Sequence, residues 1–182
     1  MARIPVHTID DAPEAARETL EALRRKQGKL LNIHAEMAHA PVVLAAYHGM
    51  QQAIAEHGSF DARTREAIAL AVGAVDGCDY CQSAHTLGAK AAGMTLDQTV
   101  EVRSGEVAFD PELAALVTLA RQITADRGDV DDSAWKAARQ AGWSDTELTE
   151  LFAHVAVNLY TNFFNHYAET ELDVPPAPGL RH

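Results

Sequence analysis

The segment AIALAVGAV, residues Ala67–Val75, constrains the fold more than any other part of the chain. If it is helical, it is apolar on every side, because no turn of it carries a charged or amide side chain. A helix of this kind has no face for water. It must lie at the centre of a helix bundle or be covered by a second subunit. The segment, with the Ala-rich faces around it, therefore predicts an oligomeric bundle.

The composition favours packed helices over a sheet. Hydrophobic residues make up 47% of the 182, many of them Ala, and only 6% are aromatic. Val and Ile, which favour strands, dominate no stretch. A chain of this length can bury a core without disulfides or metals, so we predict a single all-α domain over residues 1–182.

Capping residues, Gly and Pro divide the chain into eight predicted helices. Pro suits the first turn of a helix, Gly suits the position after its last turn, and two capping boxes mark further starts. The predicted helices cover residues 13–26, 41–56, 61–75, 78–92, a short one starting at 95, then 110–126, 131–142 and 144–170. The Pro-rich tail, residues 174–182, is expected to be extended, either on a neighbour or in solvent.

The net charge of −11 argues against nucleic acid and against anionic membrane surfaces as partners. No stretch is long and apolar enough to span a bilayer, and the N-terminus lacks the apolar core of a signal peptide. We therefore expect a cytoplasmic protein, in which thiols are kept reduced. Nothing in the composition or the motifs calls for a cofactor, and we expect none.

The only two cysteines, Cys78 and Cys81, stand three residues apart at the predicted start of a helix. With His85 they occupy positions i, i+3 and i+7, which form one stripe on a helix face. The free N–H groups and the dipole at a helix start favour a thiolate. Bridging so short a spacing would stabilise little, so we predict a chemical role for the pair.

Glu66 belongs to the preceding predicted helix, on a stripe of small apolar residues. A carboxylate there is desolvated, and its pKa rises unless a polar group partners it. If the chain reverses at Gly77, the two helices pack antiparallel and Glu66 comes level with His85. We predict a proton relay in which the carboxylate orients the imidazole and the imidazole activates a thiol.

Each of these residues has a simpler interpretation when it is taken alone. A CxxC pair can be half of a zinc site, although no second CxxC or CxxH completes four ligands, so we expect no metal. The thiols can also be buried and inert, the Glu solvated and the His a satisfied polar group. The four residues together, on a reversal between two apolar helices, favour chemistry.

Other polar residues are interpreted as structural. A stripe on the last predicted helix suggests a buried hydrogen-bond network or a subunit contact rather than a second active site. It consists of Asn158, Asn162, Asn165 and His166. Four histidines, spaced loosely around the second helix, suit surface or polar-core roles. They are His34, His39, His48 and His57.

The central motif is Arg65-Glu66, an apolar helix, Gly77-Cys78-x-Tyr80-Cys81-x-x-x-His85 and a closing Gly93. In this motif the chain resembles the alkylhydroperoxidase AhpD-like family, within the wider carboxymuconolactone decarboxylase superfamily. The likeness extends over about residues 33–174. It implies an AhpD-like helical bundle that assembles into oligomers, with trimers or hexamers favoured.

The resemblance also implies an activity, thiol-dependent reduction of a hydroperoxide, with catalytic roles for Glu66, Cys78, Cys81 and His85. The dithiol would pass through a sulfenic acid and form a disulfide, which an unidentified dithiol or protein reductant reopens. The best-known members carry a His between the cysteines, where this chain has Tyr80. Tyr80 is therefore a candidate auxiliary residue.

Two other functions stay open at this point. One is a decarboxylase-type lyase that uses His and acidic residues, although decarboxylase members of the superfamily lack the CxxC. The other is a redox-sensing oligomer that does not turn over.

The roles of the two thiols rest on opposing arguments. The helix start favours Cys78 as the thiolate by about 0.3–1 kcal/mol. A positioned base can contribute roughly 10²–10⁴-fold in rate at Cys81, beside His85. We therefore predict peroxide attack by Cys81 and resolution by Cys78.

Overall fold

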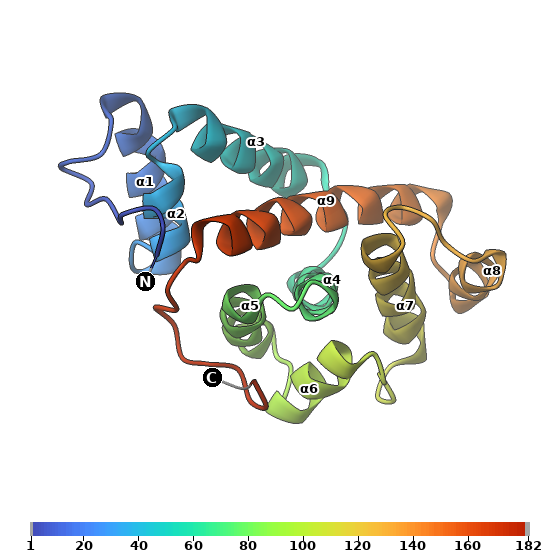
Figure 1. Cartoon of the computed structure of the whole chain (residues 1–182). Coiled ribbons are helices and arrows are strands. Elements are labelled where there is room, and N and C mark those ends of the chain that lie inside the picture. The colour runs from blue at the N-terminus through green and yellow to red at the C-terminus, as the bar shows by residue number, and fades with distance from the viewer. Residues whose placement is uncertain (1, 181–182) are drawn as a thin grey trace.

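The computed structural model describes residues 2–180, which form nine α-helices and no strand (Figure 1). The all-α prediction is confirmed, while the parts of the domain and tail predictions that fall on residues 1, 181 and 182 lie outside the described residues. The helices are α1 Glu14–Gln27, α2 Asn32–Met37, α3 Pro41–His57, α4 Ala62–Val75, α5 Asp79–Ala91, α6 Leu96–Ser104, α7 Pro111–Ala125, α8 Asp132–Ala141 and α9 Asp145–Ala168.

Helix α4 is the centre of the bundle, in contact with α5, α6, α7 and α9. Every residue from Ala67 to Gly73 is buried. The apolar segment is therefore covered by helices of its own chain. Of the two predicted arrangements, a central position in the bundle is confirmed, and the burial of Ala67–Gly73 does not require a second subunit.

Helix α9 runs across the molecule, with α3 on one side and α4 on the other (Figure 1). It contributes Leu148, Leu151 and Val155 to the core around α4, and Val157 to a second core under α1–α3. Both cysteines belong to the second core. The start of α5 therefore lies where the α1–α3 layer meets the central bundle.

Helix α2 is the element that the sequence did not predict. Its N-cap, Leu31, makes no side-chain capping bond, so the usual start signal is absent. Five of its six residues, from Ile33 to Met37, are nevertheless buried. Tertiary packing rather than capping stabilises this short helix.

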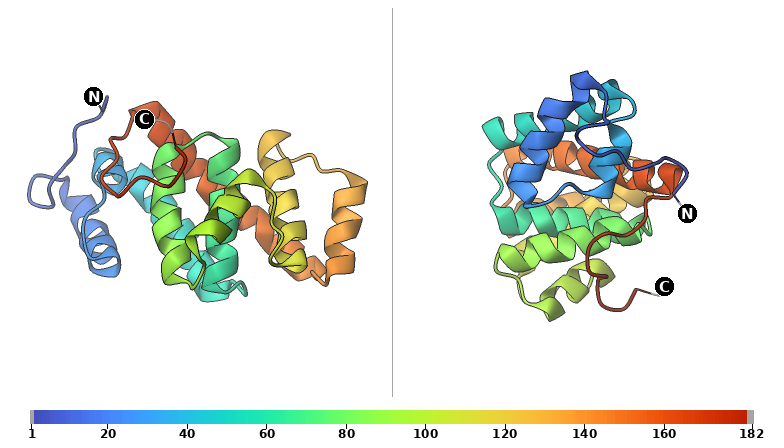
Figure 2. Two further views of the ribbon diagram at one scale, coloured as in Figure 1. Left: turned by 90° about the horizontal axis from the view of Figure 1, so that it is seen from below. Right: turned by 90° about the vertical axis from the view of Figure 1, so that its left-hand side faces the viewer.

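The C-terminal tail lies against α5 and α6 (Figure 2). The Ala177 N–H donates to Ser83 Oγ at 3.0 Å, and the Arg103 guanidinium donates to the Pro178 carbonyl. The described part of the tail thus lies on helices of its own chain, and residues 178–179 form a turn. None of the helices within residues 2–180 is long and apolar enough to cross a membrane.

Candidate active site

The two cysteines occupy the first turn of α5. Gly77 has a φ of 63°, a left-handed conformation that reverses the chain between α4 and α5. Cys78 is the N-cap residue, and its sulfur accepts a hydrogen bond from the Cys81 backbone N–H at 3.3 Å. Both thiols are free and buried. The predicted placement of Cys78 at the helix start is confirmed.

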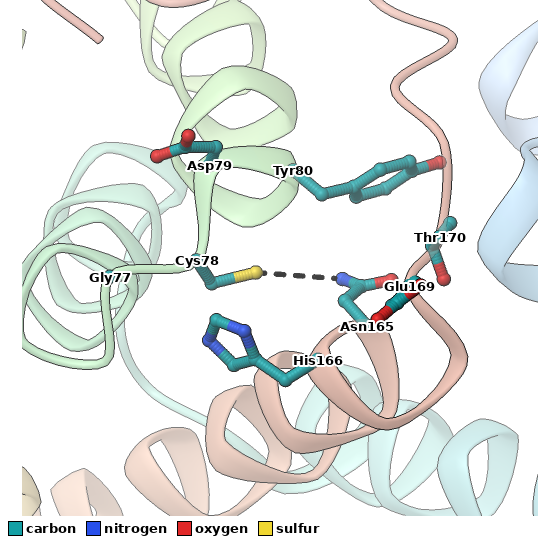
Figure 3. A pocket seen from close by; sticks show the side chains of 8 residues that line it. All are labelled: Gly77, Cys78, Asp79, Tyr80, Asn165, His166, Glu169 and Thr170. Carbon is teal, nitrogen blue, oxygen red and sulfur yellow. Dashed lines mark hydrogen bonds between the residues drawn. The ribbon is translucent and has the colours of Figure 1, made fainter. Parts of the chain in front are cut away.

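Asn165 on α9 contacts both sulfurs. Its Nδ2 donates to Cys81 Sγ at 3.2 Å. It also donates to Cys78 Sγ at 3.7 Å (Figure 3). Two neighbours on the same helix, Asn162 and His166, bond to Asp76 just before the Gly77 reversal. The buried hydrogen-bond network predicted for this stripe is confirmed. The sequence did not show that the network reaches the dithiol.

The surroundings lower the pKa of one thiol and raise the pKa of the other. The pKa of Cys78 falls from 9.0 to about 7, chiefly because the Cys81 thiol bonds its sulfur, with further help from the Cys81 N–H and Asn165. Burial is the main reason that the pKa of Cys81 lies well above the usual value, and the neighbouring Cys78 sulfur adds to it. In the reduced protein the thiolate therefore resides on Cys78.

Glu66 and His85 form the predicted pair across α4 and α5. Glu66 Oε2 lies 2.8 Å from His85 Nδ1. Burial disfavours the imidazolium, but the charge and the hydrogen bond of Glu66 outweigh it and raise the pKa of His85 above 6.5. The carboxylate holds Nδ1, which leaves Nε2 as the nitrogen that can exchange a proton with a substrate.

Each cysteine borders a different cavity. Cys78 lines an open pocket of about 280 Å³ at the end of α9, together with Tyr80 and Asn165 (Figure 3). Cys81 lines a cavity of about 80 Å³, and His85 borders the same cavity. Within the described chain no hydrogen bond joins His85 to either sulfur, so proton transfer between them would pass through a molecule in this cavity.

The cavity beside Cys81 is mostly apolar, with a few polar side chains in its lining. His34 borders it, and burial lowers the pKa of this histidine to about 4, so it is neutral. Among the described residues, two buried atoms of its lining side chains have no hydrogen-bond partner: His34 Nδ1 and Asn165 Oδ1. Buried groups of this kind favour a polar occupant. His34, which the sequence assigned to a surface or polar-core role, is thus a polar-core residue at the site.

Tyr80, the predicted auxiliary residue, is tied to the C-terminal tail. Its hydroxyl donates to Asp173 Oδ1 at 2.7 Å. Burial, and then this carboxylate, raise the pKa of Tyr80 far above its usual value, so the phenol stays protonated. Asp173 also pairs with Lys29 at 3.1 Å. Tyr80 therefore anchors the tail beside the Cys78 pocket rather than contacting a sulfur through its hydroxyl.

The described residues contain no group of three or more His, Cys, Asp or Glu side chains that could hold a metal ion. The site is thus defined by its dithiol and its Glu–His pair, carried by a helical bundle. The chain is an α-helical protein that carries a CxxC dithiol near a Glu–His pair.

The family comparison agrees with this description. Residues 41–110 match the carboxymuconolactone decarboxylase family, a segment that includes Glu66, both cysteines and His85. The match over residues 41–110 and the shared helical fold agree with the AhpD-like resemblance indicated by the sequence. No curated protein sequence matches the chain significantly.

Solved structures share the whole fold. A peroxidase-related protein from Ralstonia eutropha, described as an alkylhydroperoxidase AhpD core, is 20% identical with a TM-score of 0.84, over 94% of this chain and 92% of that one. A peroxidase-related protein from a Silicibacter species is 16% identical with a TM-score of 0.78, over 97% and 92%. The debrominase Bmp8, in complex with 2,3,4-tribromopyrrole, is 16% identical with a TM-score of 0.80, over 93% and 91%. At these identities the likeness establishes the fold.

Proposed function

We propose that this protein is a dithiol-dependent hydroperoxide reductase. One observation carries the proposal: Cys81 and His85 border the same small cavity, while Cys78 borders a second, open pocket. A hydroperoxide group would fit between a thiol and a proton donor in the first cavity. A reducing dithiol would reach Cys78 through the open pocket.

The chemistry starts from a Cys78 thiolate, a Cys81 thiol and a protonated His85. The Cys81 proton moves to the Cys78 sulfur as the Cys81 sulfur attacks the peroxide and the O–O bond breaks. His85 Nε2 protonates the leaving alkoxide, which yields an alcohol and a sulfenic acid on Cys81.

The second half of the catalytic cycle restores the Cys78–Cys81 dithiol. The Cys78 thiol attacks the sulfenic sulfur, releases water and forms the Cys78–Cys81 disulfide. One thiol of a dithiol reductant then attacks the Cys78 sulfur from the open pocket and displaces Cys81 as its thiol. The second thiol of the reductant displaces Cys78 from this mixed disulfide, and the two protons of the reductant restore the Cys81 thiol and the protonated His85. Each cycle oxidises one dithiol to a disulfide and reduces one hydroperoxide to an alcohol and water.

A steady-state assay tests this function. With cumene hydroperoxide and excess dithiothreitol, we expect many turnovers by the wild type and none by Cys78→Ser or Cys81→Ser. A single stoichiometric oxidation that then stops would identify a redox sensor instead. Equal activity in the wild type and both variants would make the cysteines spectators and overturn the proposal. No peroxide consumption by the wild type would leave the lyase as the alternative.

Sulfenic-acid trapping tests the order of attack. After one equivalent of peroxide, Cys78→Ser should accumulate a dimedone adduct at Cys81, because the resolving thiol is missing. Cys81→Ser should react far more slowly, since Cys78 does not border the His85 cavity. A fast adduct at Cys78 would reverse the two roles.

A further inference from the structure

Three cavities near Cys81 share lining residues. The cavity of about 80 Å³ beside Cys81 shares Gln27 and Tyr47 with a cavity of about 180 Å³ between α1 and α3. That cavity shares Lys26 and Gln51 with a third, of about 210 Å³. The third also borders His85, the proton donor of the proposed reaction.

The third cavity carries two cations. Lys26, near the end of α1, and Arg65, on α4, both line it. Within residues 2–180 neither side chain forms an ion pair. Glu66 supplies the only carboxylate of its lining, and that carboxylate is bonded to His85. On a chain whose net charge is −11, this cavity has a local excess of positive charge.

The walls between the cations and His85 are partly apolar. Ile54, Ala69 and Val157 line the cavity alongside the cationic groups. A ligand that uses both features has an organic body and an anionic end. Arg and Lys bind carboxylates through short, charge-assisted hydrogen bonds, and Arg does so in a two-pronged geometry. Hydrogen peroxide has neither an organic body nor an anionic end.

We propose that the substrate is an organic hydroperoxide bearing a carboxylate, which Lys26 and Arg65 bind while its peroxide end enters the Cys81 cavity. This inference rests on the proposed function and specifies its substrate class. Lys26 and Arg65 are specificity residues in this account: they act on the part of the substrate remote from the O–O bond. Their effect should therefore fall mainly on KM rather than on kcat.

The test compares cumene hydroperoxide with its para-carboxylate, two substrates with the same reacting group. In the wild type, we expect kcat/KM to be about tenfold or more higher for the carboxylate, the scale of a charge-assisted contact. Lys26→Gln and Arg65→Gln should bring the ratio of the two kcat/KM values toward one. Lys26 is exposed, so its replacement leaves the core intact.

Lys90→Gln is the matched control, since it removes the same charge from an exposed site on α5 outside the cavity. It should keep the wild-type ratio. If the wild type consumes both peroxides without a preference, or if Lys26→Gln and Arg65→Gln keep the ratio, the carboxylate site is wrong and the reductase stands. If neither peroxide is consumed, the proposed function falls, and this substrate falls with it.

Discussion

Asn165 has the most direct effect on the dithiol of any side chain outside α5. Its amide donates to both sulfurs and so favours a negative charge on Cys78. Removing this donor leaves the thiolate less stable relative to the thiol, and the pKa of Cys78 should rise.

Alkylation measures this shift. In the wild type, the iodoacetamide reaction of Cys78, followed by peptide mass mapping, should reach half its maximal rate at pH about 7. Asn165→Ala should move the midpoint upward. Asn162→Ala is the control, because Asn162 bonds Asp76 and neither sulfur. A wild-type midpoint near the ordinary 9.0, or equal midpoints in all three proteins, would contradict the account.

Glu66 positions the imidazole that serves as proton donor. Glu66→Gln keeps the size of the side chain but removes the charge that raises the pKa of His85. We expect the fold to persist and peroxide turnover to slow by roughly 10²-fold, the scale of an acid–base contribution. Circular dichroism checks the fold, and steady-state kinetics measure the rate of turnover. An unchanged rate and pH profile would assign Glu66 to packing alone.

The same pair makes stability depend on pH. The pKa of His85 is higher in the folded protein than its usual 6.5, so the imidazolium favours folding. This contribution is fully present below about pH 6.5 and is lost as the pH rises through the folded pKa. Glu66→Gln should therefore lower the free energy of unfolding more at about pH 6 than at about pH 9, measured by urea titration. An equal loss at both pH values would rule out this linkage.

At the residue scale, the sequence predicted the contacts that are close along the chain. Cys78, Cys81 and His85 lie within two turns of one helix, and Glu66 faces His85 across a short reversal. Helical periodicity is sufficient to bring such residues together. Asn165 lies far along the chain on another helix, and no local spacing reveals that it reaches the sulfurs.

At the element scale, the approach of α4 and α5 depends on a glycine. A Cβ built on Gly88 would come within 2.5 Å of the Glu66 carboxyl carbon. The absence of a side chain at this position therefore makes room for the carboxylate that holds His85.

Gly88→Ala should displace Glu66 from His85 and slow peroxide turnover, even though every charged residue of the site is kept. Gly49→Ala is the control, because Gly49 is exposed in α3 and a Cβ there meets nothing within 4 Å. That substitution should leave turnover intact and raise stability by about 0.5–1 kcal/mol. If Gly88→Ala has the kinetics of the wild type, a side chain at this position does not displace Glu66 from His85, and the prediction is wrong.

Elements with clear end signals were predicted from the sequence, and the one without them was not. The capping boxes at Thr95 and Ser144 both form and begin α6 and α9. Helix α2 lacks a capping side chain and depends on burial, which a single sequence does not display. The burial of α4 likewise depends on the packing of helices that are distant from it in the sequence, which a single sequence does not display.

At the scale of the whole molecule, assembly stays a prediction, and the surface that would support it is on α9 rather than on α4. Phe152, Phe163 and Tyr167 are 67%, 60% and 70% exposed and lie on one face of α9. A mostly apolar cavity of about 480 Å³ between Phe152 and Met50 of α3 adjoins this face. Large exposed apolar patches favour protein contacts.

We expect light scattering at micromolar concentration to give a mass above that of one chain. Phe163→Glu should lower the mass to the monomer, because a buried unpaired charge opposes association. Val100→Glu, at an exposed site on α6, should not. A monomeric wild type would contradict the prediction.

The central claim is that one Cys78–Cys81 dithiol reduces one hydroperoxide, and a single-turnover experiment tests it most directly. Reduced protein, freed of external thiol, is mixed with one equivalent of cumene hydroperoxide. The products are measured by chromatography and intact mass. The account predicts one equivalent of cumyl alcohol and a protein that has lost two hydrogen atoms to an intramolecular disulfide. Unconsumed peroxide, or alcohol formed while both thiols stay reduced, would contradict it.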